Sequence, residues 1–450
     1  MKHQRIILRK AFLLPLLILF SCSKLVEVKP PSHLVTDQII FGSDSTAKVY
    51  LSKAYESLYF TMSKYLSVQT AAYTDDLQML QSHQSWADFA RSRVAVENSF
   101  NLAAWKGLYE LVYMANLWLN RTVRSHLSDS VAKQITGEFL FLRAYAYYWL
   151  VQLYGPVPYI NQHDPIAASK ANRTAIPAIL NNMRADLSEA SVLLDWQTDL
   201  PENFQATKAA VLVLLARIEL MTGNYAAALT STEAIIQSSL YQLEKVQDVF
   251  TTKSRETIWQ LKTPKGITDD AITFIPQGNR PPNFIFRASF IQTISPDDQR
   301  FMHWISCASQ NSSSCFPYKY KFNGAVSPER TEHLVQFRLA ELVLMQAELY
   351  WRLGKPDAAL QFLNLIRSRA GLQPVEPPSG EAEMQQLLLD ERRRELFTEN
   401  GLRLYDLKRT GLIEQLLQPL KPDWKAGGEF LPIPGAEIRL NANLTQNAGY

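Results

Sequence analysis

The chain has 450 residues, with 46 Lys and Arg against 43 Asp and Glu and only 17 Gly. Glycine at about 4 %, against a usual ~7 %, favours a helical chain over a β-rich one. The basic excess comes from Lys2, Arg5, Arg9 and Lys10, without which 42 basic residues face 43 acidic ones. This charge balance predicts no nucleic-acid partner.

The N-terminal segment has the layout of a secretory signal peptide, because its basic residues are followed by an apolar run over 11–20. The run is about half as long as the roughly 20 residues that a membrane-spanning helix needs. It ends in Phe20-Ser21-Cys22, which looks like a bacterial lipobox. We therefore expect a lipoprotein signal peptide over 1–21, lipidation of Cys22 and a polar tether over 22–40. An ordinary secreted protein is the alternative.

Apolar residues recur at helical spacing through the N-terminal part, residues 41–240. In the first helix Ala47, Leu51, Ala54 and Leu58 share one face, and Ser43 can cap its start. The pattern predicts helices at about 45–63, 101–123, 129–154, 175–195, 206–222 and 225–238. This part should therefore be a stack of helices.

Two segments, 216–236 and 347–367, share one spacing, which indicates a repeat architecture. Gly223 corresponds to Gly354, and an Ala-Ala-Leu run follows each glycine. This is the helix, Gly turn, helix pattern of tetratricopeptide units, in which glycine ends the first helix and small alanines let the paired helices approach closely. The sequence therefore predicts a mostly α fold that contains helix pairs of this type.

Helical periodicity fades over residues 241–332. The segment 256–261 alternates like a strand, whereas the rest is rich in Pro, Asn, Ser and aromatic residues. Long irregular segments in a helical scaffold are more often functional or disordered than idle, and the aromatics argue against disorder. We expect an irregular insertion here and a second helical part over 333–450.

The insertion contains two further cysteines, Cys307 and Cys315, in a polar stretch. Two thiols this close in an oxidising compartment can form a disulfide that closes a short loop. Two free thiols are the alternative. No second Cys or His pair stands at ligand spacing, so we expect neither a metal site nor a cofactor.

The C-terminal part carries several short motifs in order. They are 337–348, 353–355, 359–371, Glu391-Arg-Arg-Arg-Glu-Leu-Phe397, 401–411, Leu431-Pro-Ile-Pro434 and 443–450. Together with the lipobox they resemble the SusD/RagB family of outer-membrane nutrient-binding lipoproteins of Bacteroidetes, and the resemblance covers the whole chain. It implies one SusD-like domain over 41–450, a helical scaffold with long irregular insertions and little β-structure, with 241–332 on the ligand side.

The resemblance also implies a function. Family members capture a nutrient at the cell surface, so we expect a glycan ligand, a TonB-dependent partner of the SusC type, and an outer-membrane location through the lipid, facing the exterior. Aromatic faces suit pyranose rings, and Asp, Asn and Arg suit their hydroxyls. The alternatives are a peptide-binding member of the family and a helical-repeat scaffold that binds only protein.

The sequence contains no motif that would indicate an enzyme. A nucleophile elbow, a phosphate loop, a dinucleotide fingerprint and a His-Glu-x-x-His motif are all absent. The neighbouring carboxylates of Asp75-Asp76 and Asp297-Asp298 diverge, whereas a glycosidase pair flanks one bond about 5 Å or more apart. The acids at 391, 395 and 399 fall on one helical face beside arginines, which is typical of ion pairs within a helix. We therefore expect a binding protein.

Candidate ligand-binding residues come from the two irregular segments, near 75–93 and within 262–325. Trp86 and Trp304 stand in polar, loop-like stretches, so we expect them to be stacking platforms, with Phe284 as a third face. The polar partners are Asp75, Asp76, Asn283 and Arg287. For each tryptophan the alternative is a buried support for its loop. Asp76 has the alternative of a cap or salt bridge within the scaffold, and Arg287 that of a solvated side chain.

Overall fold

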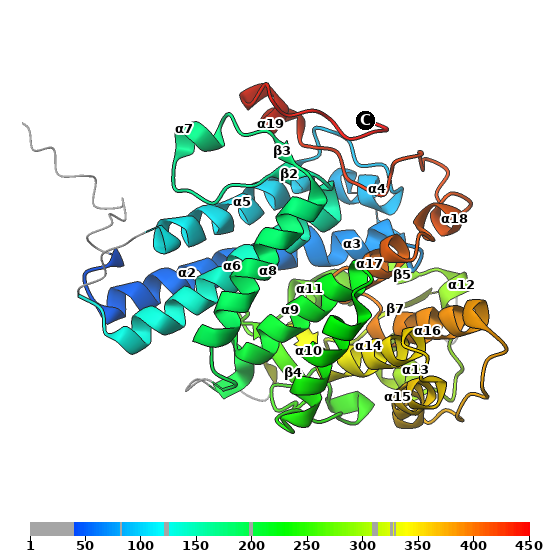
Figure 1. The fold of residues 1–450 in the computed structure, drawn as a ribbon. Helices are drawn as coiled ribbons and strands as arrows, with labels where there is room; N and C mark the ends of the chain where they lie inside the picture. The colour runs from blue at the N-terminus through cyan, green and yellow to red at the C-terminus, as the bar shows by residue number, and fades with distance from the viewer. Residues whose placement is uncertain are drawn as a thin grey trace, which may run out of the picture.

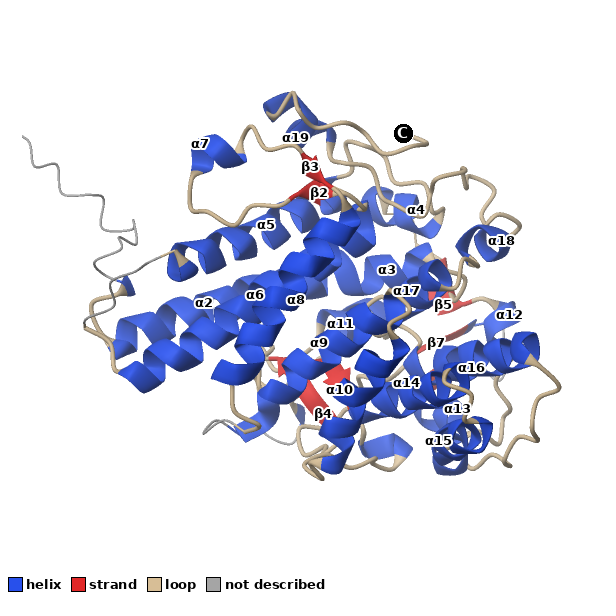
Figure 2. Ribbon diagram, in the orientation of Figure 1, coloured by secondary structure: helices blue, strands red, loops and turns tan. Residues whose placement is uncertain are grey.

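The computed structural model describes residues 40–81, 83–120, 126–197, 201–307, 314–324, 327 and 330–450. Helices make up most of the described chain, and the strands are short (Figure 2). The predicted signal peptide, Cys22 and nearly all of the tether lie outside the described residues. Within those ranges no helix is both long and apolar enough to cross a membrane.

The N-terminal part begins with the long helices α2 (Asp44–Met62), α5 (Ser99–Leu119), α6 (Asp129–Tyr154) and α8 (Ile176–Leu193) (Figure 1). Each packs on the next, α2 on α5, α5 on α6 and α6 on α8. The side chain of Ser43 caps α2 by accepting a hydrogen bond from the backbone of Thr46. In α5, a Cβ at Gly107 would lie 2.2 Å from Thr61 Oγ1, so glycine permits the close approach of α2 and α5.

The two matched segments fold as helix pairs, α9 (Lys208–Met221) with α10 (Tyr225–Gln237) and α14 (Leu339–Arg352) with α15 (Pro356–Arg369). Gly223 and Gly354 stand at the two turns with φ of 77° and 72°. A Cβ would meet nothing within 4 Å at either position, so the left-handed backbone alone explains the glycine. Because α10 packs on α14, the pairs form one stack, and the predicted repeat is confirmed.

Shorter helices join these long ones. The short α-helices are α3 (Val68–Tyr73), α4 (Gln84–Ala90), α7 (Pro165–Ala168), α11 (Asp269–Phe274), α12 (Ala288–Ile291), α13 (Gln299–Trp304), α17 (Leu402–Arg409), α18 (Ile413–Leu417) and α19 (Gly435–Leu440). Another long helix is α16 (Glu381–Leu396), and the 3-10 turns are η2 (Pro201–Asn203) and η3 (Val246–Asp248). A π-helix, η1 (Ser63–Ser67), joins α2 to α3.

The strands form two-stranded antiparallel pairs. They are β1 (Leu77–Met79) with β5 (Phe284–Phe286), β2 (Val157–Pro158) with β3 (Arg173–Thr174), β4 (Thr257–Leu261) with β8 (Leu334–Arg338), and β6 (Ile305–Cys307) with β7 (Cys315–Pro317). β4 is the strand predicted near 256–261. In the core, its Trp259 packs edge-on against Phe141 and Tyr145 of α6, with ring centroids 4.9 and 5.0 Å apart.

The two segments expected to be irregular contain regular elements. The stretch around Trp86 is helix α4, with Ala87 and Phe89 buried. The stretch around Trp304 is helix α13, which begins where the side chain of Asp298 accepts a hydrogen bond from the backbone of Arg300. Short helices this polar have no long apolar stripe, so periodicity alone does not reveal them.

The acidic motif of the C-terminal part forms ion pairs mainly between elements. α16 ends at Leu396, so Glu399 is not on its face. Arg338 of β8 contacts Glu256, Glu395 and Glu399, and all of these side chains are buried. Arg394 and Glu391, 3.0 Å apart, form an ion pair within helix α16. The structural role predicted for these acids therefore holds, whereas pairing within one helix is the exception.

Candidate ligand-binding face

The pairing of β1 with β5 brings the two predicted ligand segments together. Leu77 lies opposite Phe286 and Met79 opposite Phe284. Just beyond β1, the backbone N–H of Leu80 donates to the carbonyl of Asn283 at 2.8 Å. α4 follows directly, so its residues stand over the end of this strand pair.

Four aromatic side chains gather at this junction, and we call His83, Trp86, Phe100 and Tyr65 the aromatic face. His83 is exposed, and the other three are half-buried. The His83 ring lies 4.8 Å from that of Trp86 and stacks on Phe100 at 5.5 Å, and Tyr65 lies 5.7 Å from Phe100. Trp86 Nε1 is covered and has no hydrogen-bond partner in the described chain, so packing holds the ring.

Polar groups border the aromatic face. Asn283 is half-buried, and its Nδ2 donates to the carbonyl of Thr273 at 3.2 Å. The exposed turn 277–280 closes with a bridge between Gln277 and Arg280. Leu80 is 48 % exposed at the end of β1. The junction therefore combines aromatic rings with the amide of Asn283, which directly precedes β5.

Phe284 lies beneath the aromatic face. It is 0 % exposed, and its ring meets Trp86 edge-on at 5.6 Å. It therefore supports Trp86 and presents no face of its own, which corrects its predicted role.

The predicted role of Trp304 as a stacking platform is also wrong. The side chain is 1 % exposed, its Nε1 donates to the carbonyl of Val246 at 2.8 Å, and its ring packs against Phe250 and Phe397. The ammonium of Lys319 lies 4.8 Å from the ring centroid. Trp304 therefore belongs to the core around the buried ion pairs, which is the structural alternative, and cannot stack on a ligand.

Asp75 and Asp76 are also structural. Asp75 accepts hydrogen bonds from Arg403, and Arg393 contacts both aspartates. Burial would raise the pKa of Asp75, but the hydrogen bonds and charge of Arg403 and the charge of Arg393 outweigh it and lower the pKa to about 2. Burial raises the pKa of Asp76, against the opposing charge of Arg393. Both carboxylates are buried and paired, so neither is available to sugar hydroxyls.

Arg287 holds the strand pair together. Its Nε donates to the carbonyl of Leu77 at 3.1 Å, and its backbone N–H donates to the carbonyl of Asp76 at 2.8 Å. Burial lowers its pKa, against the charge of Asp75. Nearby, Lys421 donates to the carbonyls of Ala72 and Ala90, which ties α3 to α4. Arg287 is half-buried and its Nε is engaged, and its role as a ligand-binding group stays a prediction.

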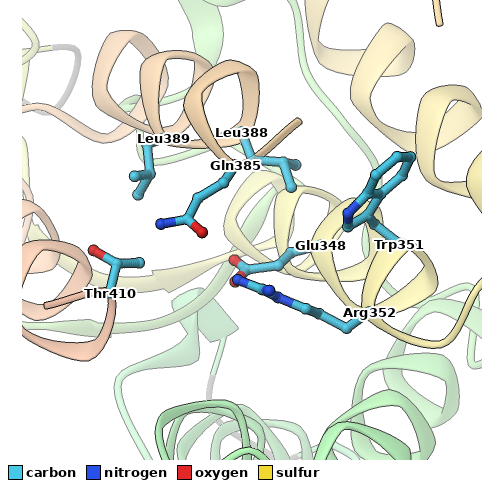
Figure 3. Close-up of a pocket in the computed structure, with 7 residues that line it drawn as sticks. All are labelled: Glu348, Trp351, Arg352, Gln385, Leu388, Leu389 and Thr410. Carbon is cyan, nitrogen blue, oxygen red and sulfur yellow. The ribbon is translucent and has the colours of Figure 1, made fainter. Parts of the chain in front are cut away.

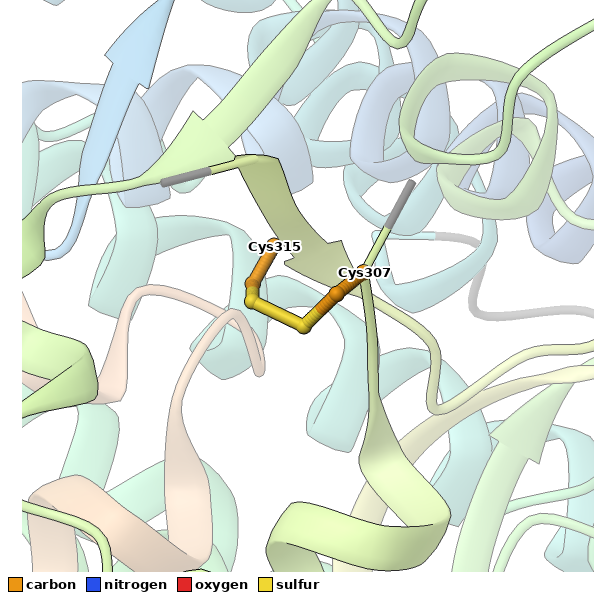
Figure 4. Close-up of a disulfide and its surroundings, with 2 residues drawn as sticks. All are labelled: Cys307 and Cys315. Atoms are coloured by element: carbon orange, nitrogen blue, oxygen red, sulfur yellow. A yellow bond between two sulfur atoms is a disulfide. The ribbon is translucent and has the colours of Figure 1, made fainter. Parts of the chain in front are cut away.

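The two cysteines of the insertion are bonded in the structure, with the sulfur atoms 2.05 Å apart (Figure 4). Cys307 lies opposite Cys315 in the register of β6 and β7. The intervening residues 308–313 lie outside the described chain. The bond therefore closes a short hairpin.

Two hollows of the described surface are lined by residues outside the aromatic face. The pocket in Figure 3, where Glu348 and Arg352 of α14 face Gln385 and Leu388 of α16, holds only about 10 Å³, which suits a single water. A wider groove of 660 Å³ lies between α2 and the end of β4. No cluster of three or more His, Cys, Asp or Glu side chains in the described ranges is placed to hold a metal.

Sequence reasoning missed three members of the aromatic face. His83 is the extended residue that directly precedes α4, and Trp86 lies in the first turn of that helix, so their proximity appears only once α4 is recognised. Phe100 opens α5 and Tyr65 lies in η1, far from Trp86 in sequence. Only tertiary packing brings these rings together.

Two family models match the chain. One, described as "Starch-binding associating with outer membrane", matches residues 24–220, and the other, described as "SusD family", matches residues 306–450. The chain is 23 % identical to SusD-like protein P38 of Formosa agariphila, over 93 % of this chain and 94 % of that protein. It is 35 % identical to starch-binding protein SusD of Bacteroides thetaiotaomicron, over 25 % of this chain and 21 % of that protein.

Solved structures have the same fold. A SusD superfamily protein from Bacteroides vulgatus superposes with a TM-score of 0.78 at 18 % identity, covering 91 % of this chain and 100 % of that one. Surface glycan-binding protein A from Bacteroides thetaiotaomicron, in complex with laminarihexaose, gives 0.75 at 22 % identity, covering 90 % and 99 %. With both family models, relatives along nearly the whole length and this helical fold, the chain belongs to the SusD/RagB family.

Proposed function

We propose that the protein captures a glycan at the bacterial surface, holds it on the aromatic face and passes it to a TonB-dependent transporter of the SusC type. It does no chemistry on the glycan. Lipid on Cys22 holds it to the outer membrane. The aromatic face is the observation that carries the binding proposal, and the family carries the proposed delivery and location.

The chemistry of the aromatic face suits a sugar chain. A pyranose ring has an apolar face that packs on a flat aromatic ring, while its hydroxyls need hydrogen-bond partners at the edge. His83 and Phe100 supply stacked rings, and the amide of Asn283, just before β5, is available at the same junction for hydroxyl groups.

The proposal is tested by calorimetry on the chain lacking residues 1–22, with laminarihexaose, a linear starch oligosaccharide and a mixture of tryptic peptides as probes. Binding of either oligosaccharide supports a glycan ligand. Binding of the peptides alone favours the peptide alternative, and binding of none favours a scaffold that holds only protein.

Trp86→Ala should lower the affinity for the bound oligosaccharide about thirtyfold, which corresponds to about 2 kcal/mol for a lost aromatic contact. Trp196→Ala is the matched control, because Trp196 is also half-exposed but lies beyond the end of α8. Equal affinity of the two variants would place the ligand elsewhere.

A further inference from the structure

The groove of 660 Å³ between α2 and the end of β4 has the size of a ligand site. Ligand-binding clefts in proteins hold about 300–1,000 Å³. Three stretches of chain line this one: α2 from Val49 to Glu56, the segment 202–205 that begins within η2, and residues 261–264 at the end of β4. Tertiary packing therefore brings distant parts of the chain together here, as it does at the aromatic face.

Two aromatic rings form part of the groove wall. Tyr55 of α2 and Phe204 are both half-buried. The hydroxyl of Tyr55 donates to Glu138 Oε2 at 2.5 Å and accepts a hydrogen bond from the backbone N–H of Ala206 at 2.9 Å. The ring of Phe204 packs edge-on against that of His333, with the centroids 4.7 Å apart. Contacts within the protein therefore fix both rings.

The segment that carries Phe204 is held against β4. Asn203 Nδ2 donates to the carbonyl of Thr257 at 2.7 Å. Gln260 Nε2 donates to the carbonyl of Glu202, also at 2.7 Å. Glu202 and Asn203 have φ of 74° and 53°, a left-handed backbone that is uncommon without glycine and that gathers at ligand sites. This wall is therefore preorganised, which lowers the cost of binding a ligand.

Polar groups without a partner in the protein line the same groove. The side chains of Glu202, Gln205 and Lys262 make no hydrogen bond or ion pair with any described residue. Gln205 is half-buried. The ammonium of Lys262 lies 5.6 Å from the centroid of the Phe204 ring, which places a hydrogen-bond donor beside that ring. A carboxylate, an amide and an ammonium group are thus free to bind a ligand.

The composition of the lining indicates an uncharged, amphipathic ligand. Its charged residues are Lys53, Glu56, Glu202 and Lys262, so the two signs balance. A pyranose ring has an apolar face for an aromatic ring and hydroxyls for the amide and charged groups around it. An amphipathic peptide helix needs an apolar groove. The exposed lining of α2 does not offer one, because it continues from Val49 to Ser52 and Lys53.

We propose that this groove is a second glycan-binding site, in which the rings of Tyr55 and Phe204 contact sugar rings. The free polar groups of Glu202, Gln205 and Lys262 bind hydroxyls of the same ligand. The inference rests on the proposed capture of a glycan, and the groove shares no residue with the aromatic face. The competing role of Phe204 is purely structural, and it predicts lower stability on truncation without any effect on binding.

The test is equilibrium dialysis of the chain lacking residues 1–22 against labelled laminarihexaose, a labelled linear starch oligosaccharide and labelled tryptic peptides, each alone. The isotherm for at least one oligosaccharide should saturate at two molecules per chain. Phe204→Ala should weaken one class of sites about tenfold, as expected for a lost aromatic contact. Trp86→Ala should weaken the other class.

Two further variants separate binding from folding. Gln205→Ala removes a free amide outside the core, so it should fold and weaken the same class of sites as Phe204→Ala. Phe60→Ala is the matched control, because this ring is 36 % exposed on α2 and lies outside the groove, so binding should be that of the parent. Thermal unfolding shows which variants lose stability.

The outcomes distinguish this inference from the proposed function. A single class of sites that Trp86→Ala weakens and that Phe204→Ala and Gln205→Ala leave unaltered overturns the second site alone. A single class that only the two groove variants weaken supports the groove and removes the aromatic face. Peptide binding that Phe204→Ala weakens, without oligosaccharide binding, overturns the glycan assignment. Absence of any oligosaccharide binding overturns both proposals.

Discussion

Arg403 donates to both carboxylate oxygens of Asp75, from Nε to Oδ1 at 2.9 Å and from Nη2 to Oδ2 at 2.7 Å. The pair joins α17 to the segment after α3, and Arg393 of α16 contacts the same carboxylate at 3.1 Å. The segment that leads into the β1–β5 junction is therefore held to the C-terminal part by buried ion pairs. Asp75, which looks like a ligand-binding group in the sequence, instead forms the ion pairs that hold these two parts of the chain together.

Asp75→Asn should destabilise the fold by about 3 kcal/mol at pH 7, because it leaves two buried arginines short of a counter-charge. In the parent, the folded pKa of about 2 lies below the unfolded value of 3.8, so the stabilisation is complete above 3.8 and is lost as pH falls through 2. Urea unfolding at pH 7 and near pH 2 measures this. If the difference in the free energy of unfolding between parent and variant stays constant with pH, the low pKa of Asp75 is refuted.

Trp304→Ala should destabilise the fold by about 3–5 kcal/mol, since it empties a buried site and removes a hydrogen bond to Val246. The affinity for glycan per folded molecule should not change. Chemical denaturation gives the first quantity, and calorimetry on the folded fraction gives the second. Weaker binding at unchanged stability would return Trp304 to the ligand site.

Much of the scaffold could be read from the sequence, because helix faces and turns are local signals. Apolar spacing located α6 and α9 to within two residues, and the glycine turns located the repeat. The Cys spacing suggested the pair that the structure bonds. These features depend on residues a few positions apart.

The candidate ligand-binding site was harder to predict, because it depends on contacts between distant segments. A tryptophan in a polar stretch of sequence gives the same signal whether its side chain is partly exposed, as that of Trp86 is, or buried, as that of Trp304 is. Asp75 looks free until Arg403, far along the chain, is placed beside it. Burial and charge pairing are tertiary properties that composition and spacing do not carry.

Because of Glu138, the free energy of unfolding should fall as the pH rises from about 4.5 to 7. Glu138 is buried, and burial raises its pKa from 4.5 to about 7, although hydrogen bonds from Tyr55 and Gln134 oppose the rise. The folded state therefore keeps a proton that the unfolded state releases in this window, at a cost of about 3 kcal/mol above it. Glu138→Gln removes this dependence and should be more stable than the parent at pH 8. Parallel stability curves for the two proteins would contradict the prediction.

Replacing Cys307 and Cys315 with Ser should lower stability by about 2–3 kcal/mol at most, because the bond closes a short loop and restricts the unfolded chain only locally. Mass spectrometry after alkylation without a reductant should find neither thiol modified in the native protein. Two alkylated thiols would show that the hairpin is held by β6 and β7 alone.

Cys22→Ala should release the protein from the membrane fraction. The prediction follows from the apolar run over 11–20 and the Phe20-Ser21-Cys22 sequence that ends it. Two acyl chains on Cys22 give stable attachment where a single chain is marginal. Fractionation of cells that express the full chain is the measurement, and the Cys307→Ser variant, which also loses one thiol, is the control that should stay bound. If Cys22→Ala remains in the membrane fraction after a high-salt wash, attachment by lipid at this residue is wrong.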